Sequence, residues 1–309
     1  MRDAMISLRQ IRSFVSVFEE CSFTRAAARE GSTQSGISQH IKQLEAHIGR
    51  ALFEREGRVV VPTPVGEDYY RDCVETLRRL DAATQTASAG RHAGRLRIGL
   101  MPTFTRGALA PALARFMQAT PGAEVHITEA YSGVLTEMVR SGDLDFAVVP
   151  GFEGARGLST TLLAREREML VAARGETALH LHPARPRDLD GRDIILPSGV
   201  NTRRHTLETY FTTHGVAIGR RMEMDAMIGT LEFIAQSSWV AILPSIMMVG
   251  DRMGERFSIR PLEHPSLSSD FVLIEPSRQA MSAPAQAFAD LLRDETARIS
   301  RQWEDLLAA

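Results

Sequence analysis

The chain has 309 residues, and 44% of them are apolar, which is enough to build the cores of about two packed domains. Its formal net charge of −2 excludes a generally basic surface as the sign of a nucleic-acid partner, so such a partner must be argued from local residues. No uninterrupted apolar stretch approaches the ~18 residues that cross a bilayer, and no apolar leader opens the chain. We therefore expect a soluble, cytoplasmic protein without a membrane partner.

The N-terminal segment is predicted to form three helices. Apolar residues recur at helical spacing up to Phe18, and a second, shorter helix follows Ser22, which is a good helix cap. A tight turn then leads to a third helix, which Ser32 or Thr33 can cap. Two helices joined in this way form a helix-turn-helix, which we place at about residues 23–42.

A short β-ribbon and a long helix are expected next. Residues 54–61 are β-prone around a glycine turn, and the prolines that follow close this wing. From Val65 onward, apolar and small residues repeat every three or four positions, with charged residues on the other faces. A seam this narrow is too exposed for a lone helix, so we expect it to pair with a second copy of the chain. Gly90 and Gly94 mark a linker.

Beyond Arg95 the pattern changes to alternating strands and helices. This order implies a parallel sheet with helices on both faces, followed by a second unit of similar kind and a long C-terminal helix. Strands are expected at 96–100, 125–127, 146–149, 169–173, 194–196, 221–224, 240–243, 257–262 and 271–274, and helices at 108–117, 134–140, 202–213, 228–235 and 283–306.

Several motifs resemble those of the LysR-type transcriptional regulators. Those in the first 66 residues stand in the family's order and spacing, which makes the match specific. Later segments look like the family's periplasmic-binding-protein-like effector domain, so the resemblance covers essentially the whole chain. The motifs are Ser22–Ala27, Thr33–Glu45, Leu52–Arg55 and Thr63–Gly66, and then Leu96–Gly99, Ser141–Phe146 and Ile242–Pro244.

The resemblance implies an all-α winged helix-turn-helix domain joined to an α/β periplasmic-binding-protein-like (type 2) effector domain. We place the first at 6–64, a dimerising linker helix at 65–92 and the effector domain at 93–309. The effector domain would comprise subdomain I, at about 95–163 and 266–309, and subdomain II, at about 164–265. The implied partners are double-stranded operator DNA, a small-molecule effector and further copies of the chain, as a homodimer or homotetramer, with RNA polymerase as another candidate. No cofactor and no metal are expected.

The third helix offers polar side chains that can read DNA. Its apolar side packs inward, so its N-terminal part can enter the major groove, where Gln34 can pair with adenine. Cationic and hydroxyl side chains suit contacts to phosphates. The local charge adds only weak support, because residues 1–63 hold nine basic and seven acidic residues. From spacing alone, a merely solvated polar face explains this helix equally well. The expected DNA-binding residues are Thr24, Thr33, Gln34, Ser35, Ser38, Gln39, Lys42, Arg55, Arg58 and Thr63.

A ligand site is expected where the parallel strands end. Helix N-termini there offer free N–H groups to anions, and hydroxyl-rich helix starts suit a small organic acid. The resemblance likewise implies an effector bound between two subdomains, and Trp239 could add an apolar wall. The alternative is that Ser132 and Thr202 only cap helices. The expected effector-binding residues are Thr103, Phe104, Ser132, Ser198, Asn201, Thr202 and Met227.

Two positions depart from the family's pattern. Glu30 stands where leucine is usual, so the packing between the two helices must differ, or the carboxylate must reach solvent. Gln236–Trp239 stands where an Ala-Gly-x-Gly run is common. Without the two glycines, the close approach of helix and strand there, and with it the shape of the cleft, is in question.

Other classes of protein fit less well. A solute-binding transport protein would share the C-terminal architecture. The N-terminal domain of this chain and its expected lack of a signal peptide argue against that class. An α/β enzyme would need an activated nucleophile or a cofactor loop, and the sequence has no P-loop, Gly-x-Ser-x-Gly or dinucleotide fingerprint. His180 and His182 lack further ligands at metal-site spacing, and Cys21 and Cys73 are too few for a disulfide framework.

Overall fold

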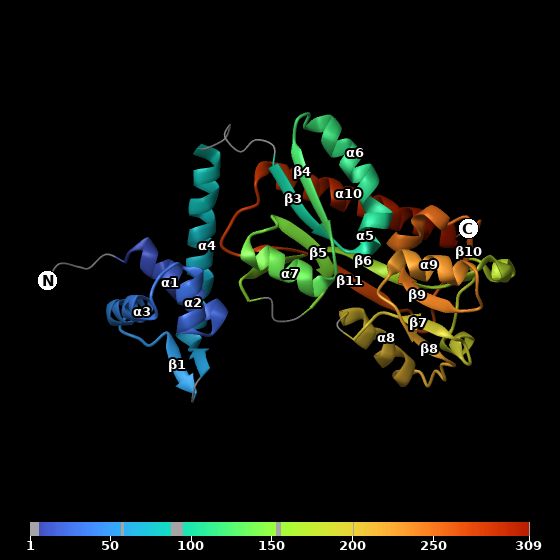
Figure 1. The fold of residues 1–309 in the computed structure, drawn as a ribbon, viewed down its shortest axis with the longest axis horizontal. Coiled ribbons are helices and arrows are strands. Elements are labelled where there is room, and N and C mark those ends of the chain that lie inside the picture. Colours follow the sequence, from blue (N-terminus) through green and yellow to red (C-terminus); the bar gives the residue numbers. More distant parts are fainter. Residues whose placement is uncertain (1–5, 57–58, 88–94, 153–155, 200, 309) are drawn as a thin grey trace. The chain divides into compact units, whose positions relative to one another are not determined.

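The computed structural model describes residues 6–56, 59–87, 95–152, 156–199 and 201–308 (Figure 1). These residues form two compact units, each with its own apolar core. The N-terminal unit comprises residues up to position 88 together with 277–280, and the C-terminal unit comprises the rest. None of the helices built from the described residues is long and apolar enough to cross a membrane.

The N-terminal unit contains the predicted helices and ribbon. Ser22 and Thr33 cap the second and third helices, because each side chain accepts a hydrogen bond from a backbone N–H of the first turn. Gly49 ends the third helix in the left-handed conformation, at φ 76°. The elements are α1 (Leu8–Glu20), α2 (Phe23–Arg29), α3 (Gln34–Ile48), the antiparallel pair β1 (Phe53–Glu56) and β2 (Val59–Pro62), and α4 (Pro64–Ala87).

The apolar seam of α4 divides into two parts. Near its start, the Tyr70 ring stacks on Phe18 of α1 at 3.9 Å between centroids, and Cys73 and Leu77 are buried in the core of the same unit. Leu80, by contrast, is 44% exposed. This unit therefore buries the first half of the seam itself, and the pairing of the helix with a second copy stays a prediction.

The C-terminal unit is built on a mixed sheet, in which the described strands follow the order β4-β3-β5-β11-β6-β9-β7-β8, with β10 beside β6. The predicted parallel pairs are present, since β3 lies between β4 and β5, and β7 lies between β8 and β9. The long strands β6 and β11 run antiparallel to their neighbours and join the two halves. The strands are β3 (Arg95–Leu100), β4 (Glu124–Glu129), β5 (Phe146–Pro150), β6 (Leu158–Ala173), β7 (Ile194–Leu196), β8 (Arg221–Glu223), β9 (Val240–Pro244), β10 (Phe257–Pro261) and β11 (Ser268–Pro276).

Helices cover both faces of this sheet. Successive side chains of a strand point to opposite faces, so Phe146 and Val148 of β5 join the core beneath α6 and α10, whereas Ala147 and Val149 join the core beneath α7. Figure 1 shows α6 and α10 on the side of the sheet away from α7. The helices are α5 (Pro102–Phe104), which continues through a π-helical turn (Thr105–Leu109) into α6 (Ala110–Ala119), then α7 (Ser132–Ser141), α8 (Thr202–Thr213), α9 (Met227–Ala235) and α10 (Ala283–Ala308).

Two local expectations are resolved by hydrogen bonds. β6 begins at Leu158, far before the predicted 169–173. The sequence pattern does not reveal this, because Glu166 and Glu168 occupy inward-facing positions of the strand, where polar partners stabilise them. The turn before β9 forms without the usual glycines, since the Ser237 hydroxyl accepts the backbone N–H of Trp239 at 3.3 Å.

Candidate functional site

The outer face of α3 carries a row of exposed polar side chains. Its inner face is closed, with Ile37 and Leu44 at 0% exposure. The cap residue Thr33 belongs to both the surface and the fold, because its hydroxyl accepts the Gly36 N–H at 3.1 Å. Of the residues expected to contact DNA, Thr24, Thr33, Gln34, Ser35, Gln39 and Lys42 are exposed, and Ser38 is half-buried.

Side-chain hydrogen bonds hold α3 in place. The Ser13 hydroxyl of α1 lies 2.7 Å from Nδ1 of His40, so the two helices are tied near the middle of α3. Further along, the Glu45 carboxylate accepts the backbone N–H of Leu52 at 2.8 Å, just before the ribbon begins. The helix therefore presents its polar face from a rigid support, which lowers the entropy lost when a partner binds.

The structure corrects the expectation that Thr63 contacts phosphate. This residue is 8% exposed, and its hydroxyl donates to the carbonyl of Ala51 at 2.8 Å while accepting the N–H of Gly66 at 3.0 Å. Both hydrogen-bonding capacities are thus used to start α4. The side chain of Arg55, and the whole of Arg58, lie outside the residues that the structure describes.

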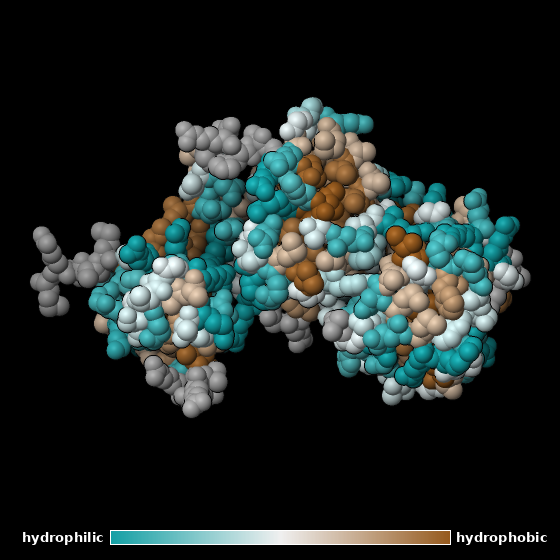
Figure 2. Space-filling model, viewed as in Figure 1, coloured by the Kyte–Doolittle hydropathy of each residue, from teal (hydrophilic) through white to brown (hydrophobic). Residues whose placement is uncertain are grey.

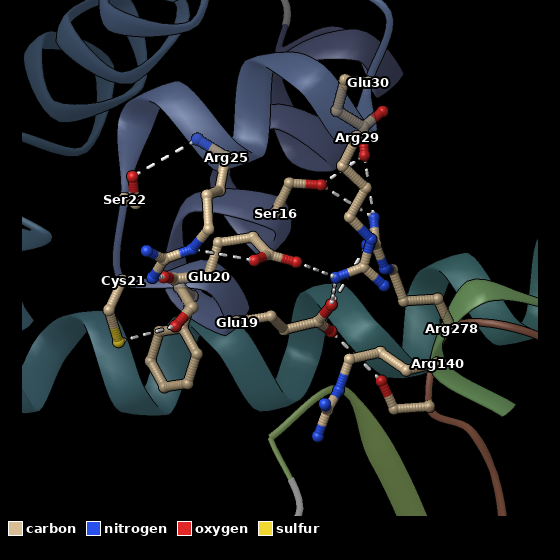
Figure 3. A network of polar contacts seen from close by, with 12 residues as sticks. Ser16, Glu19, Glu20, Cys21, Ser22, Arg25, Arg29, Glu30, Arg140 and Arg278 are labelled. Carbon is tan, nitrogen blue, oxygen red and sulfur yellow. Dashed lines mark hydrogen bonds and ion pairs between the residues drawn. The ribbon is translucent and has the colours of Figure 1, made fainter. Parts of the chain in front are cut away.

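The unusual Glu30 is part of a polar network within the N-terminal unit (Figure 3). Its carboxylate accepts hydrogen bonds from the Ser16 hydroxyl and from Nη1 of Arg278 at 3.0 Å. The same Nη1 also donates to the Ser16 oxygen at 3.1 Å. The charge therefore does not have to reach solvent, because it is paired at the junction of α1 and α2.

A second carboxylate completes this network. The Glu19 side chain is 1% exposed and accepts from Arg29 at 2.7 Å, from Arg278 at 3.0 Å and from the Tyr70 hydroxyl at 2.9 Å (Figure 3). The network thus connects α1, α2, α4 and the segment 277–280, and it fixes the helix that precedes α3.

In the C-terminal unit, a narrow cleft lies where parallel strands end and helices begin. Residues after β3, β7 and β8 contribute to it, as the rule for parallel sheets predicts. Among the lining residues are Met101, Pro102, Thr103, Tyr131, Pro197, Asn201, Arg203, Met224, Asp225, Met227 and Thr230.

The cleft brings together some of the expected effector residues. Thr103, Asn201 and Met227 line it. The expectation for Phe104 is wrong, because this ring is fully buried in the core against Phe271, at 5.1 Å between centroids.

The other expected hydroxyl residues lie outside the lining. Ser132 is buried, Thr202 is exposed, and the Ser198 hydroxyl is buried without a hydrogen-bond partner in the described part of the chain. Nor do Ser132 and Thr202 cap their helices, since the N-cap positions of α7 and α8 are held by Tyr131 and Asn201.

Sequence reasoning missed three polar groups of the cleft. Arg203 stands in the first turn of α8, where it is 4% exposed and pairs with Glu168. Asp225 lies just beyond β8, which ends at Glu223, so the strand-end rule applied to that short strand would have found it. Tyr131 follows β4 in the same way, and burial, followed by the charges of Asp225 and Glu129, raises the pKa of its phenol.

Family models match most of the chain. The one described as the LysR substrate binding domain matches residues 89–297, and the one described as a bacterial regulatory helix-turn-helix protein of the lysR family matches residues 8–67. The chain is 27% identical over 298 residues to a probable nitrogen assimilation transcriptional activator of Synechococcus elongatus, covering 93% of this chain and 94% of that protein.

Solved structures with the same fold include regulators at full length. Full-length OxyR from Pseudomonas aeruginosa matches with a TM-score of 0.58 at 20% identity, over 94% of this chain and 95% of that one. Full-length CbnR in complex with its target DNA matches with a TM-score of 0.55 at 20% identity, over 94% and 99% of the two chains. At such identities the similarity concerns the fold.

Proposed function

Because this chain belongs to the LysR family of bacterial regulatory helix-turn-helix proteins, we propose that it reads operator DNA as a dimer or tetramer through α3. It is a DNA-binding transcription regulator with an effector-binding domain, and not an enzyme. The observation that carries the proposal is the outer face of α3, which is polar and exposed where the inner face is fully buried.

We assign the parts of the chain as follows. DNA reading belongs to 6–64, self-association to the linker helix at 65–92, and effector binding to 93–309, with subdomain I at 95–163 and 266–309 and subdomain II at 164–265. A regulator of bacterial DNA acts in the cytoplasm, and RNA polymerase is its natural further partner. The effector is a small organic acid bound in the cleft near Thr103, Asn201 and Met227.

Self-association is supported by apolar surface. Leu80 on α4 is 44% exposed, and Figure 2 shows apolar side chains gathered over α6, where Met117 is 42% exposed. Apolar side chains gathered on the surface of a chain favour contact with another copy. Two such surfaces on one chain are compatible with a dimer that assembles further into a tetramer.

The test compares two substitutions on α3. Gln34→Ala removes a side chain suited to adenine, so we expect it to cost ~1–3 kcal/mol and to relax one base position. Lys42→Ala removes a phosphate contact, so we expect weaker binding to all sequences and a salt slope lower by about one. Gel-shift titrations over operator variants and salt concentrations measure both effects.

The control is Gln286→Ala, which removes a glutamine that hydrogen-bonds Asp290 on α10 and leaves α3 unchanged. Its operator affinity should equal that of the unmodified chain. If Gln34→Ala and Lys42→Ala also leave binding unchanged, α3 is not the DNA-reading helix.

A further inference from the structure

The arginine that lines the cleft is already neutralised. Arg203 is 4% exposed, and its guanidinium donates two hydrogen bonds to Glu168, at 3.1 Å and 2.6 Å, and one to the carbonyl of Ile242 at 3.2 Å. A buried, bidentate pair of this kind keeps its partner, because separating the two would leave Glu168 buried and unpaired. Arg203 therefore shapes the wall and offers no free positive charge to an anion.

Asp225, in contrast, gives the cleft a free negative charge. Its carboxylate accepts the backbone N–H of Ser198 at 3.0 Å, and no ion pair to it is present among the described residues. The next arginine on α8, Arg204, is shared between Glu208 at 2.7 Å and Glu223 at 3.7 Å. A ligand in this cleft therefore meets an unbalanced carboxylate.

The start of α7 has the opposite preference. Its N-cap residue, Tyr131, lines the cleft and makes no side-chain capping bond, so the first N–H groups of this ten-residue helix are not used by a side chain. The Tyr131 hydroxyl is itself buried and has no hydrogen-bond partner within the described residues. Helix N–H groups and a neutral phenol both donate hydrogen bonds, which a carboxylate accepts.

We propose that the ligand of this cleft is a zwitterion, namely an amino acid or a close analogue. Its ammonium group pairs with Asp225, and its carboxylate accepts hydrogen bonds at the start of α7 and from the Tyr131 hydroxyl. This inference rests on the proposed effector function and adds a second charge to the organic acid. An acid without the ammonium group would place like charge beside Asp225 with no free cation to balance it.

The experiment is isothermal titration calorimetry on the full chain with matched pairs of probes. Each common L-amino acid is compared with its 2-hydroxy acid, which keeps the carboxylate and side chain but replaces the ammonium group with a hydroxyl. We expect at least one amino acid to bind. Its hydroxy acid should bind more weakly by a factor of about ten or more, because a charge-assisted hydrogen bond is lost. The inference is wrong if no amino acid binds, or if hydroxy or dicarboxylic acids bind as tightly.

Asp225→Asn isolates the charge. An asparagine oxygen can still accept the Ser198 N–H, so the local fold is retained while the negative charge is removed. We expect the amino acid to lose about tenfold in affinity and its advantage over the hydroxy acid to disappear. An advantage of unchanged size in this variant would contradict the role of Asp225.

The control is Asp294→Asn, which removes a 65% exposed carboxylate of α10 outside the cleft lining and should leave both affinities unchanged. Operator binding, measured by gel shift on the same preparations, separates the two proposals. A chain that binds operator DNA but no amino acid contradicts the zwitterion and leaves the regulator intact, whereas a chain that binds no DNA contradicts the proposed function itself.

Discussion

Glu166 and Glu168 lie two residues apart on β6, and each is 1% exposed, but they are stabilised in different ways. Glu168 has the guanidinium of Arg203 beside it, at 2.6 Å. Glu166 accepts hydrogen bonds from the Ser245 hydroxyl at 2.5 Å and from the backbone N–H of Ile246 at 2.9 Å. Burial raises the pKa of Glu166, these hydrogen bonds oppose the rise, and the charge of Glu168 adds to it.

This difference predicts opposite behaviour of two matched substitutions. A folded-state pKa above the unfolded value means that the stability contributed by Glu166 is present at low pH and is lost as the pH rises through the raised pKa. Glu166→Gln cannot ionise, so its free energy of unfolding should fall less with pH above the ordinary carboxyl range. Glu168→Gln should cost about 3–5 kcal/mol at neutral pH, because Arg203 stays buried without its counter-charge.

Urea denaturation at a series of pH values measures both effects. A Glu166→Gln variant whose stability follows the pH dependence of the unmodified chain would show that Glu166 is ionised in the folded state. Glu168→Gln with unchanged stability would show that Arg203 finds another partner.

Glu30 shows how far one residue can be interpreted without a fold. Its position identifies a charge at a helix junction that usually holds leucine. Its partner Arg278 is 248 residues away along the chain, and no local pattern indicates such a contact. The carboxylate is tolerated because a distant arginine and the buried Ser16 hydroxyl accompany it.

Among the elements, α4 depends on a glycine in its first turn. A Cβ built at Gly66 would lie 2.2 Å from the carbonyl oxygen of Leu52, so only glycine allows α4 to start against the chain that enters the ribbon. Gly133 has a similar place in the first turn of α7, but a Cβ there meets nothing within 4 Å.

These two glycines should therefore respond oppositely to alanine. We expect Gly66→Ala to destabilise the N-terminal unit by about 1–3 kcal/mol, because backbone must move to relieve the overlap. Gly133→Ala should be neutral or stabilising by up to about 1 kcal/mol, since alanine favours helix. Thermal unfolding, together with hydrogen exchange in α1 and α4, checks both. Equal effects of the two substitutions would contradict the close contact at Gly66.

At the scale of the whole molecule, the exposed half of α4 bears on assembly. Leu80→Asp replaces a 44% exposed apolar side chain of α4 with a charged one, so we expect the dimer to weaken by about 2 kcal/mol or more. Sedimentation velocity should show dissociation at higher protein concentration, and operator affinity should fall with it. Leu162→Asp, at a 54% exposed position on β6, serves as the control and should leave the dimer unchanged. Equal dimerisation of the two variants would exclude Leu80 from the interface.

The sequence by itself determined most of the elements and indicated the family. Periodicity and caps located the three helices up to Gly49, and the ordered motifs around Thr33 and Thr63 indicated the fold before any coordinates. These features are local, because helix caps, turn glycines and apolar spacing act within a few residues of one another.

Only the tertiary structure decided which polar residues are free to act. It turned Thr63 inward as a cap, buried Phe104 in the core, and placed Asp225 and Tyr131 on one cleft. Whether a hydroxyl or a charge is available depends on partners brought from distant segments, as Glu168 does for Arg203. Such pairings arise from packing between elements, and the spacing of residues along the chain does not predict them.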